Sequence, residues 1–556
     1  MGKAAQLPGS GLTFGGCPSI LESDVWQEKS KTAANQGGES LVSCGLRSVN
    51  NKHEENNMND LKIMLGQRLS VGFDGFEIPE EFARLIREYK VGNVILFRRN
   101  VQSFAQLRRL CAELRALIVR ETGRIPFIML DEECGSVSRL AHIGTPTPSA
   151  MAIGATGNAE NARAVGGMIG DELRAAGINF NLAPILDCNT NIHNPVIGVR
   201  SFGSDPKLVS AMGVAYAQGL MAAGVVACGK HFPGHGDTAV DSHIGLPIVD
   251  KSADEVRRVE LVSFKAAIDA GIDAIMSAHV IFPALEPERV PSTVSKKVLT
   301  GLLREEMGFE GLIVSDGMEM KAVMDMFGIE DATRRALNAG VDIALICHSA
   351  RQASDTLDLL YAAAEDGRLD LAMNERSFER ICAAKDKQEK APAGVPDDFG
   401  SEAHKQAARE IMYEGVRLLH APEGKPLFDV GKDTLFFGAP AIQASFASDE
   451  LTLDAAKVCA ERLGGVFVPD ALAGRDELIA GAAAVKAVLI LSDNDPQLAE
   501  MTELGNALAE AGAEITVIAM TTPYCLDALS DKVWKAAVYQ YDWMGVDALM
   551  HLLSQG

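Results

Sequence analysis

The sequence has no run of about 18 apolar residues, so we expect no transmembrane helix. It is also poor in positive charge, with 52 Lys and Arg against 75 Asp and Glu and a formal net charge of −23. Such a surface repels phosphate backbones, which argues against nucleic acid as a partner. Its 10 cysteines are scattered without a Cys-x-x-Cys pair, which argues against a disulfide scaffold or zinc ribbon. With no signal-peptide pattern, these features predict a cytoplasmic protein with free thiols.

Composition and hydrophobic pattern divide the chain into four parts. Residues 1–57 are rich in Gly, Ser, Asn, Lys and Glu, which predicts a disordered extension. Residues 58–384 alternate short apolar runs with amphipathic helical stretches. Residues 385–401 are polar with two prolines and read as a linker. Residues 402–556 alternate again and predict a smaller α/β sandwich domain.

The alternation in residues 58–384 predicts a parallel α/β domain, and its count favours a closed (β/α)8 barrel over an open doubly wound sheet. The apolar runs cover residues 91–97, 126–130, 180–186, 225–228, 274–278, 312–315 and 343–347. Polar or charged residues follow these runs, namely Arg98, Asp131, Asp187, Lys230, His279, Asp316 and His348. In a barrel these positions ring one mouth, where barrel active sites are built.

The segment from Lys230 to His243, K-H-F-P-G-H-G-D-T-A-V-D-S-H, holds three histidines, two aspartates and a lysine. Its Pro and Gly residues predict a loop that leaves the end of a strand. Asp241 and His243 are two residues apart, so in an extended loop their side chains point the same way and the carboxylate can orient the imidazole for acid–base chemistry. A zinc site is the less favoured alternative, because the spacing matches no common metal motif.

Asp316 lies where an apolar strand ends, in S-D-G-M-E-M at 315–320. A rigid strand would aim this carboxylate at the mouth, where it could act as a nucleophile; a helix cap is the alternative role. Two further segments, D-E-E-C-G-S-V-S-R at 131–139 and N-P-V-I-G-V-R-S-F-G at 194–203, offer donors and acceptors of the kind that bind sugar hydroxyls. Each could equally be a structural salt-bridge node.

Together these four segments resemble glycoside hydrolase family 3, in particular its two-domain β-N-acetylglucosaminidase branch. The match is K-H-F-P-G-H-G-D-T-x-x-D-S-H, N-P-V-I-G-x-R-S-F-G, D-x-E-x-G-x-V-x-R and S-D-x-x-x-M. Cys134 stands where the family typically has Gly. The resemblance implies a retaining exo-glycosidase that removes terminal non-reducing β-linked N-acetylglucosamine from peptidoglycan-derived or chitin-like oligosaccharides.

By position in these motifs, the resemblance implies Asp316 as the nucleophile of a covalent glycosyl intermediate and His243, with Asp241, as the acid–base pair. The sugar-binding residues that it implies are Asp131, Arg139, Arg200, Lys230 and His231. We expect a small carbohydrate partner and neither metal nor cofactor, and we leave a homodimer open. The alternatives are a phosphorylase or a β-glucosidase of the same family and, more distantly, a non-catalytic sugar-binding protein.

Overall fold

The computed structural model describes residues 58–241, 245–422, 425–440 and 452–555. The predicted extension, residues 1–57, lies outside these ranges, as do Ser242 and the predicted acid–base residue His243. Among the helices of the described ranges, none is both long and apolar enough to cross a membrane.

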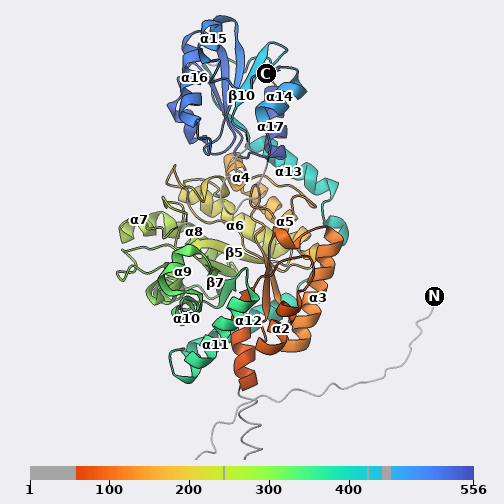
Figure 1. Ribbon diagram of the computed structural model, residues 1–556, viewed down its shortest axis with the longest axis vertical. Helices are drawn as coiled ribbons and strands as arrows, with labels where there is room; N and C mark the ends of the chain where they lie inside the picture. Colours follow the sequence, from red (N-terminus) through yellow and green to blue (C-terminus); the bar gives the residue numbers. More distant parts are fainter. Residues whose placement is uncertain (1–57, 242–244, 423–424, 441–451, 556) are drawn as a thin grey trace, which may run out of the picture. The chain divides into compact units, whose positions relative to one another are not determined.

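The first part of the described chain is a closed barrel of eight parallel strands, which confirms the predicted (β/α)8 fold (Figure 1). Each strand pairs with the next in chain order, and the last pairs with the first. Apolar side chains such as Phe127, Phe180 and Met276 fill the interior as one buried cluster. The strands are β1 Leu69–Val71, β2 Asn93–Leu96, β3 Phe127–Leu130, β4 Phe180–Asn181, β5 Val226–Phe232, β6 Ala274–Ser277, β7 Leu312–Gly317 and β8 Ile343–Ile346.

Three strands differ most from the prediction. β1 was not among the expected runs, because it is short and Ser70 interrupts its apolar residues. β4 ends at Asn181 instead of residue 186, since Pro184 has no N–H to donate to a ladder. β5 extends to Phe232, so Lys230 and His231 belong to a strand and not to the predicted loop. The Phe232 carbonyl accepts the N–H of Ala278 at 2.7 Å, which continues the pairing with β6.

Helices connect the barrel strands and cover them (Figure 1). Their ends follow ordinary capping chemistry: the Ser103 hydroxyl accepts the N–H of Gln106 at the start of α3, and Gly123 ends that helix with φ 73°. The main helices are α2 Glu80–Tyr89, α3 Phe104–Thr122, α4 Ala150–Thr156, α5 Ala159–Ala176, α6 Pro206–Ala222, α7 Ala253–Arg258, α8 Glu260–Asp269, η4 Lys297–Glu306, α9 Lys321–Phe327, α10 Ile329–Ala339, α11 Ala350–Glu365 and α12 Leu371–Glu389.

The predicted linker, residues 385–401, begins inside α12, which continues to Glu389. The extra turn is held by Lys385, a buried residue whose Nζ donates to Gln67 Oε1 at 2.5 Å and to the Gly92 carbonyl at 2.9 Å. The polar composition of residues 385–389 predicted a linker, but these residues form the end of a helix that packs against the barrel.

The C-terminal part contains a six-stranded mixed sheet in the order β11-β10-β12-β13-β14-β9, in which β9 alone runs antiparallel. Figure 1 shows α15 and α16 on one side of this sheet and α14 and α17 on the other, the layering expected for an α/β sandwich. Its elements are α13 Glu402–Gly415, β9 Arg417–His420, β10 Thr434–Gly438, α14 Ala455–Leu463, β11 Val466–Phe467, α15 Arg475–Ala480, β12 Lys486–Leu491, α16 Leu498–Glu510, β13 Glu514–Ala519, β14 Trp534–Ala537 and α17 Trp543–Leu553.

The barrel and the sandwich are packed together by apolar and polar contacts. Met151 and Val199 of the barrel belong to the buried cluster of the sandwich. The Ser149 hydroxyl donates to the Tyr539 carbonyl at 2.7 Å, and the Ser149 N–H donates to Gln540 Oε1 at 2.6 Å. These contacts bring the loops of the sandwich beside the barrel mouth.

Candidate active site

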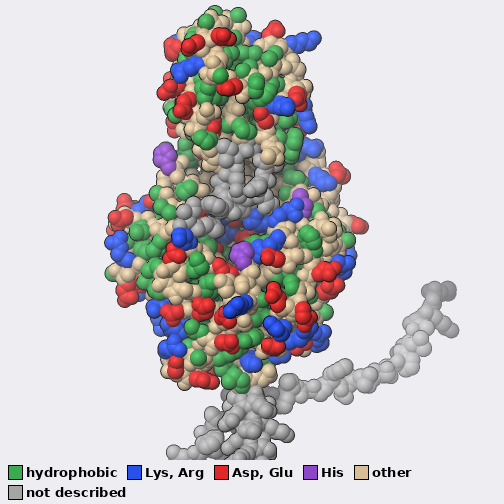
Figure 2. Space-filling model, viewed as in Figure 1, with side chains coloured by type: hydrophobic (Ala, Val, Ile, Leu, Met, Phe, Trp, Pro, Cys, Tyr) green, Lys and Arg blue, Asp and Glu red, His purple; other side chains and the backbone are tan. Residues whose placement is uncertain are grey.

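A cavity of about 510 Å³ lies at the mouth of the barrel, where the carboxyl ends of its strands meet. In Figure 2 the surface is hollowed below the sandwich, and Lys and Arg side chains lie in the hollow. The structure brings together in this cavity six of the residues expected from the sequence, namely Asp131, Arg139, Arg200, Lys230, His231 and Asp316. Asp241 is described and buried but does not line this cavity, and His243 lies outside the described residues.

Four ionic side chains form a buried cluster on one wall. Glu133, which the sequence did not single out, receives two hydrogen bonds of 2.8 Å from the Arg200 guanidinium and lies 2.6 Å from Lys230 Nζ. Lys230 Nζ also donates to Asp131 Oδ1 at 2.7 Å. The two cations and two anions balance in charge, as buried ions require.

The pKa values of the cluster follow from this pairing. Burial would raise the pKa of Glu133, but Arg200 and Lys230 outweigh it and hold that pKa well below its ordinary value. Burial likewise opposes the charge of Lys230, yet Asp131 and Glu133 raise its pKa. Glu133 and Lys230 are therefore charged at neutral pH, and the cluster presents fixed hydrogen-bonding groups to a ligand.

Asp187 anchors the segment that leaves β5. It is fully buried, and its carboxylate accepts the N–H of His231 at 3.1 Å, the N–H of His235 at 2.7 Å and a bond of 2.7 Å from His231 Nδ1. Burial would raise its pKa, but the histidines and these donors lower it below the ordinary value. Asp187 thus fixes the orientation of the predicted sugar-binding residue His231, with Nδ1 turned to the carboxylate.

Asp316 stands near the end of β7, as predicted, and its Oδ1 accepts the N–H of Gly317 at 2.8 Å. His279 lies behind it: Nε2 is 2.9 Å from the Gly317 carbonyl and Nδ1 is 2.9 Å from the Thr293 hydroxyl. Because this histidine and the strand ladder hold the backbone on either side, the carboxylate is presented to the cavity from a rigid support.

The segment that leads to Asp241 is tied to the neighbouring loop of residues 189–200. The Asn194 amide donates to the His235 carbonyl at 2.8 Å, and Asp237 lies 3.0 Å from the Thr190 hydroxyl and 3.1 Å from Lys251 Nζ. Asp241 is 4% exposed, and its carbonyl accepts the N–H of Gly245 at 2.9 Å. The described part of the segment is therefore firmly placed up to the residue that we expect to orient His243.

Further polar and aromatic residues at the cavity were not predicted as site residues. The ring of Phe97 stacks on the ring of His348 with 5.5 Å between their centres. The guanidinium carbon of Arg99 lies 4.3 Å from the centre of the Phe97 ring. Glu319 accepts the N–H groups of Cys347 and His348 at 2.8 and 2.9 Å. The positions of Arg98-Arg99 and His348 directly after apolar runs were the sequence signals for this group.

In the described ranges, no group of three or more His, Cys, Asp or Glu side chains is arranged to hold a metal ion. Nδ1 of His231 contacts Asp187, and Nδ1 of His235 lies 2.8 Å from the Thr238 hydroxyl. Burial and the neighbouring His231 lower the pKa of His235 to about 4, so it is uncharged at neutral pH.

The family model for the glycosyl hydrolase family 3 N-terminal domain matches residues 58–384, the whole barrel with all the site residues above. The chain belongs to glycosyl hydrolase family 3. This confirms the family expected from the four sequence motifs.

Curated relatives within family 3 carry β-hexosaminidase names. A β-hexosaminidase A from Pseudoalteromonas piscicida is 36% identical over 394 residues, which are 64% of this chain and 66% of that protein. A β-hexosaminidase from Thiobacillus denitrificans is 37% identical over 289 residues, 51% of this chain and 79% of that protein.

Among solved structures, a family 3 β-N-acetylglucosaminidase from Paenibacillus sp. str. FPU-7 superposes with a TM-score of 0.78 at 33% identity. The match covers 89% of this chain and 96% of that one, so it includes the C-terminal sandwich. A β-glucoside phosphorylase superposes at 0.72 with 20% identity, a likeness that concerns the fold alone.

Proposed function

We propose that this family 3 enzyme is a retaining exo-β-N-acetylglucosaminidase that removes terminal non-reducing N-acetylglucosamine from peptidoglycan-derived or chitin-like oligosaccharides. The names of its relatives support the sugar specificity. The observation that carries the proposal is the geometry of the mouth: Asp316 lines the same cavity as the ionic cluster of Asp131, Glu133, Lys230 and Arg200.

The ionic cluster suits a sugar ring. Carboxylates accept hydrogen bonds from hydroxyl groups, and ammonium and guanidinium groups donate to ring and hydroxyl oxygens. Because these groups already hold one another in place, binding of the sugar costs little reordering. A sugar held there has Asp316 as the carboxylate that attacks its anomeric carbon.

The reaction proceeds in two displacements. In the first, Asp316 forms a bond to the anomeric carbon while the bond to the leaving oxygen breaks, and that oxygen takes a proton from His243. In the second, His243 takes a proton from water, the water oxygen bonds to the anomeric carbon and the Asp316 carboxylate is released. Asp241 orients the His243 ring and stabilises its cation.

The test is release of nitrophenol from the nitrophenyl β-N-acetylglucosaminide and, in parallel, from the β-glucoside. We expect turnover of the first substrate, and we expect Asp316→Ala to lower kcat by at least about a thousandfold because the covalent step is lost. Asp269→Ala is the matched control, since Asp269 pairs with Lys265 on the exposed surface of α8, away from the cavity. Preference for the glucoside, or full activity of Asp316→Ala, would overturn the proposal.

Two further readouts define the mechanism. His243→Ala should harm natural oligosaccharides far more than aryl glycosides, because a nitrophenolate leaves without a proton. Equal losses on both substrates would contradict the acid role of His243. Inorganic phosphate in the assay separates hydrolysis from phosphorolysis, since only phosphorolysis yields the sugar 1-phosphate.

A further inference from the structure

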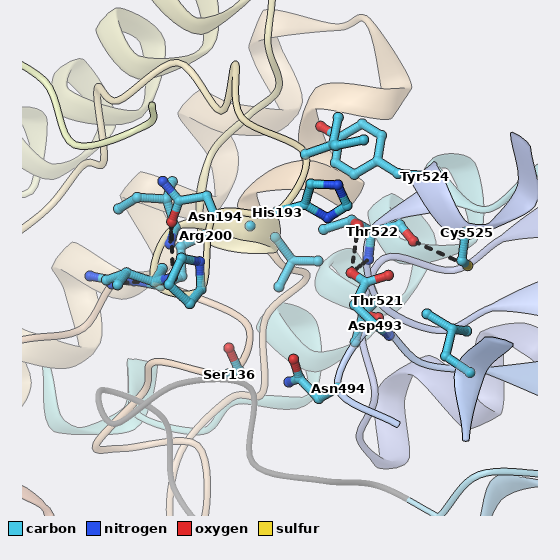
Figure 3. Close-up of a pocket in the computed structure, with 17 residues that line it drawn as sticks. Ser136, His193, Asn194, Arg200, Asp493, Asn494, Thr521, Thr522, Tyr524 and Cys525 are labelled. Atoms are coloured by element: carbon cyan, nitrogen blue, oxygen red, sulfur yellow. Dashed lines mark hydrogen bonds between the residues drawn. The ribbon is translucent and has the colours of Figure 1, made fainter. Parts of the chain in front are cut away.

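A second cavity, of about 330 Å³, continues from the barrel mouth toward the sandwich. It shares Val196 and Arg200 with the first cavity, so the two spaces adjoin along one loop. Figure 3 shows Asp493, Thr522 and Tyr524 of the sandwich on one side, Asn194 and Arg200 of the barrel on the other, and His193 beside Tyr524.

The sandwich side is built from the residues that follow β12 and β13. Ligands of open α/β sheets bind outside the carboxyl ends of parallel strands, which is where Asp493 and Thr522 lie. The Asp493 carboxylate accepts the N–H of Thr522 at 3.0 Å and also its hydroxyl. The Asp493 N–H donates to the Thr521 hydroxyl at 2.9 Å. These bonds fix the carboxylate at the cavity wall.

The barrel side is joined to the sandwich across this cavity. The Asn189 amide of the barrel donates to the Tyr524 hydroxyl at 3.2 Å. The other lining groups are short and polar or apolar, among them Asn194, Asn494, Ile197 and Leu498. The space is therefore bordered by hydrogen-bonding groups of the kind found in sugar sites.

The two charged residues of this cavity differ in their partners. Of the lining residues in the described part of the chain, Asp493 and Arg200 are the two with a formal charge, beside one histidine, His193. The Arg200 guanidinium is matched by Glu133 through two bonds of 2.8 Å. Among the described side chains that line the cavity, none is a cation paired with Asp493, so its carboxylate faces whatever enters.

We propose that this cavity receives the leaving-group sugar of the substrate, and that Asp493 makes it selective for an uncharged sugar over one that carries a carboxylate. This inference rests on the proposed function, because it extends the substrate beyond the residue held beside Asp316. Of the two substrate classes left open above, it selects chitin-like oligosaccharides over those whose leaving sugar bears a lactate ether, as in peptidoglycan.

The experiment compares three disaccharides that release the same N-acetylglucosamine. The leaving sugar is N-acetylglucosamine, its lactate ether with a free carboxylate, or the methyl ester of that ether. The last two differ in charge and hardly in size, so their ratio of kcat/KM isolates electrostatics. We expect wild type to hydrolyse the ester about tenfold better than the free acid.

Two variants change the charge of the cavity in opposite directions. Asp493→Asn should shrink the ester-to-acid ratio at least about threefold, and Asn494→Asp, which adds a carboxylate at an exposed lining position, should widen it. Asp476→Asn on the exposed face of α15 removes the same charge away from the cavity and should leave the ratio unchanged. Asn494→Asp keeps the test available if Asp493→Asn, which loses a bond to Thr522, does not fold.

A wild-type ratio near one, or a ratio that neither cavity variant moves, overturns the inference. Hydrolysis of the nitrophenyl β-N-acetylglucosaminide by the same preparations separates this result from failure of the proposed function. If wild type cleaves the aryl substrate and the ratio stays at one, the activity stands and the selectivity of the second cavity does not.

Discussion

Replacing Glu133 with Gln tests whether the ionic cluster is held by Glu133. The variant keeps the size of the side chain but leaves Lys230 and Arg200 with Asp131 as their one remaining anion in the cluster, a net charge of +1 among side chains that are 2 to 18% exposed. Breaking a buried ion pair costs about 3–5 kcal/mol. Because the Gln oxygen still accepts one bond, we expect the lower end, a loss of about 3 kcal/mol in the free energy of unfolding.

Glu132→Gln is the matched control one residue away. Glu132 is also buried, but its Oε2 accepts the N–H groups of Arg139 and Leu140 at 2.8 and 3.1 Å, which a Gln oxygen can replace. Burial raises the pKa of Glu132 to about 7, so burial disfavours the charge of this carboxylate, which is about half protonated at pH 7 in the wild type. Removing its charge should therefore cost less than about 1 kcal/mol.

The two variants should also differ in their dependence on pH. The pKa of Glu133 is lowered on folding, so its contribution is full above its ordinary value of 4.5 and is lost as pH falls toward the folded pKa. The stability gap between wild type and Glu133→Gln should then shrink below about pH 4.5. The pKa of Glu132 is raised from 4.5 to about 7, so wild type loses stability as pH rises through that range and Glu132→Gln does not.

Urea unfolding at several pH values measures both effects, with circular dichroism for the whole fold and tryptophan fluorescence, to which Trp534 and Trp543 of the sandwich contribute. Coincident curves justify a two-state free energy. Equal losses in Glu133→Gln and Glu132→Gln at pH 7.5 would refute the reasoning, because they would mean that burial and not ion pairing sets the cost.

Two further predictions concern the segment that leaves β5. Asp187→Asn should lower kcat about 10- to 100-fold and shift the pH profile, because an amide cannot accept the His231 and His235 donors as the carboxylate does; an unchanged pH profile would leave Asp187 a purely structural role. Gly236→Ala should abolish most turnover, because a Cβ there overlaps the Cys188 carbonyl, whereas Gly167→Ala on α5, with nothing within 4 Å, should keep wild-type activity and melting temperature.

The barrel could be predicted because strand–helix alternation and polar residues at strand ends are local patterns. The short strand β1 escaped because Ser70 interrupts its apolar residues, and β5 was cut short because the polar Lys230 and His231 lie inside it. Both strands are held by ladders to neighbours far along the chain, such as the pairing of β1 with β8. Such ladders leave no local trace in composition.

The same limit explains which site residues were found. The six expected residues that line the cavity, Asp316 among them, stood in recognisable motifs, whereas Glu133 and Asp187 owe their roles to partners 67 and 44 residues away. The sequence around a carboxylate does not specify which distant residue will pair with it in the fold. Glu133 belongs to the D-E-E-C-G-S-V-S-R motif and Asp187 follows an apolar run, but neither pattern specifies which residue pairs with these carboxylates.

The exposure of the four side chains in the ionic cluster distinguishes the one that can bind substrate from those that support it. The Asp131 side chain is 18% exposed, whereas Lys230, Glu133 and Arg200 are 2, 3 and 7% exposed. Asp131 is therefore the member best placed to meet a sugar hydroxyl, and Glu133 holds the two cations from behind. Substitution of Asp131 should mainly weaken substrate binding, because its contact forms with the ligand. Substitution of Glu133 should mainly lower the stability of the fold, because its ion pairs are complete without the ligand.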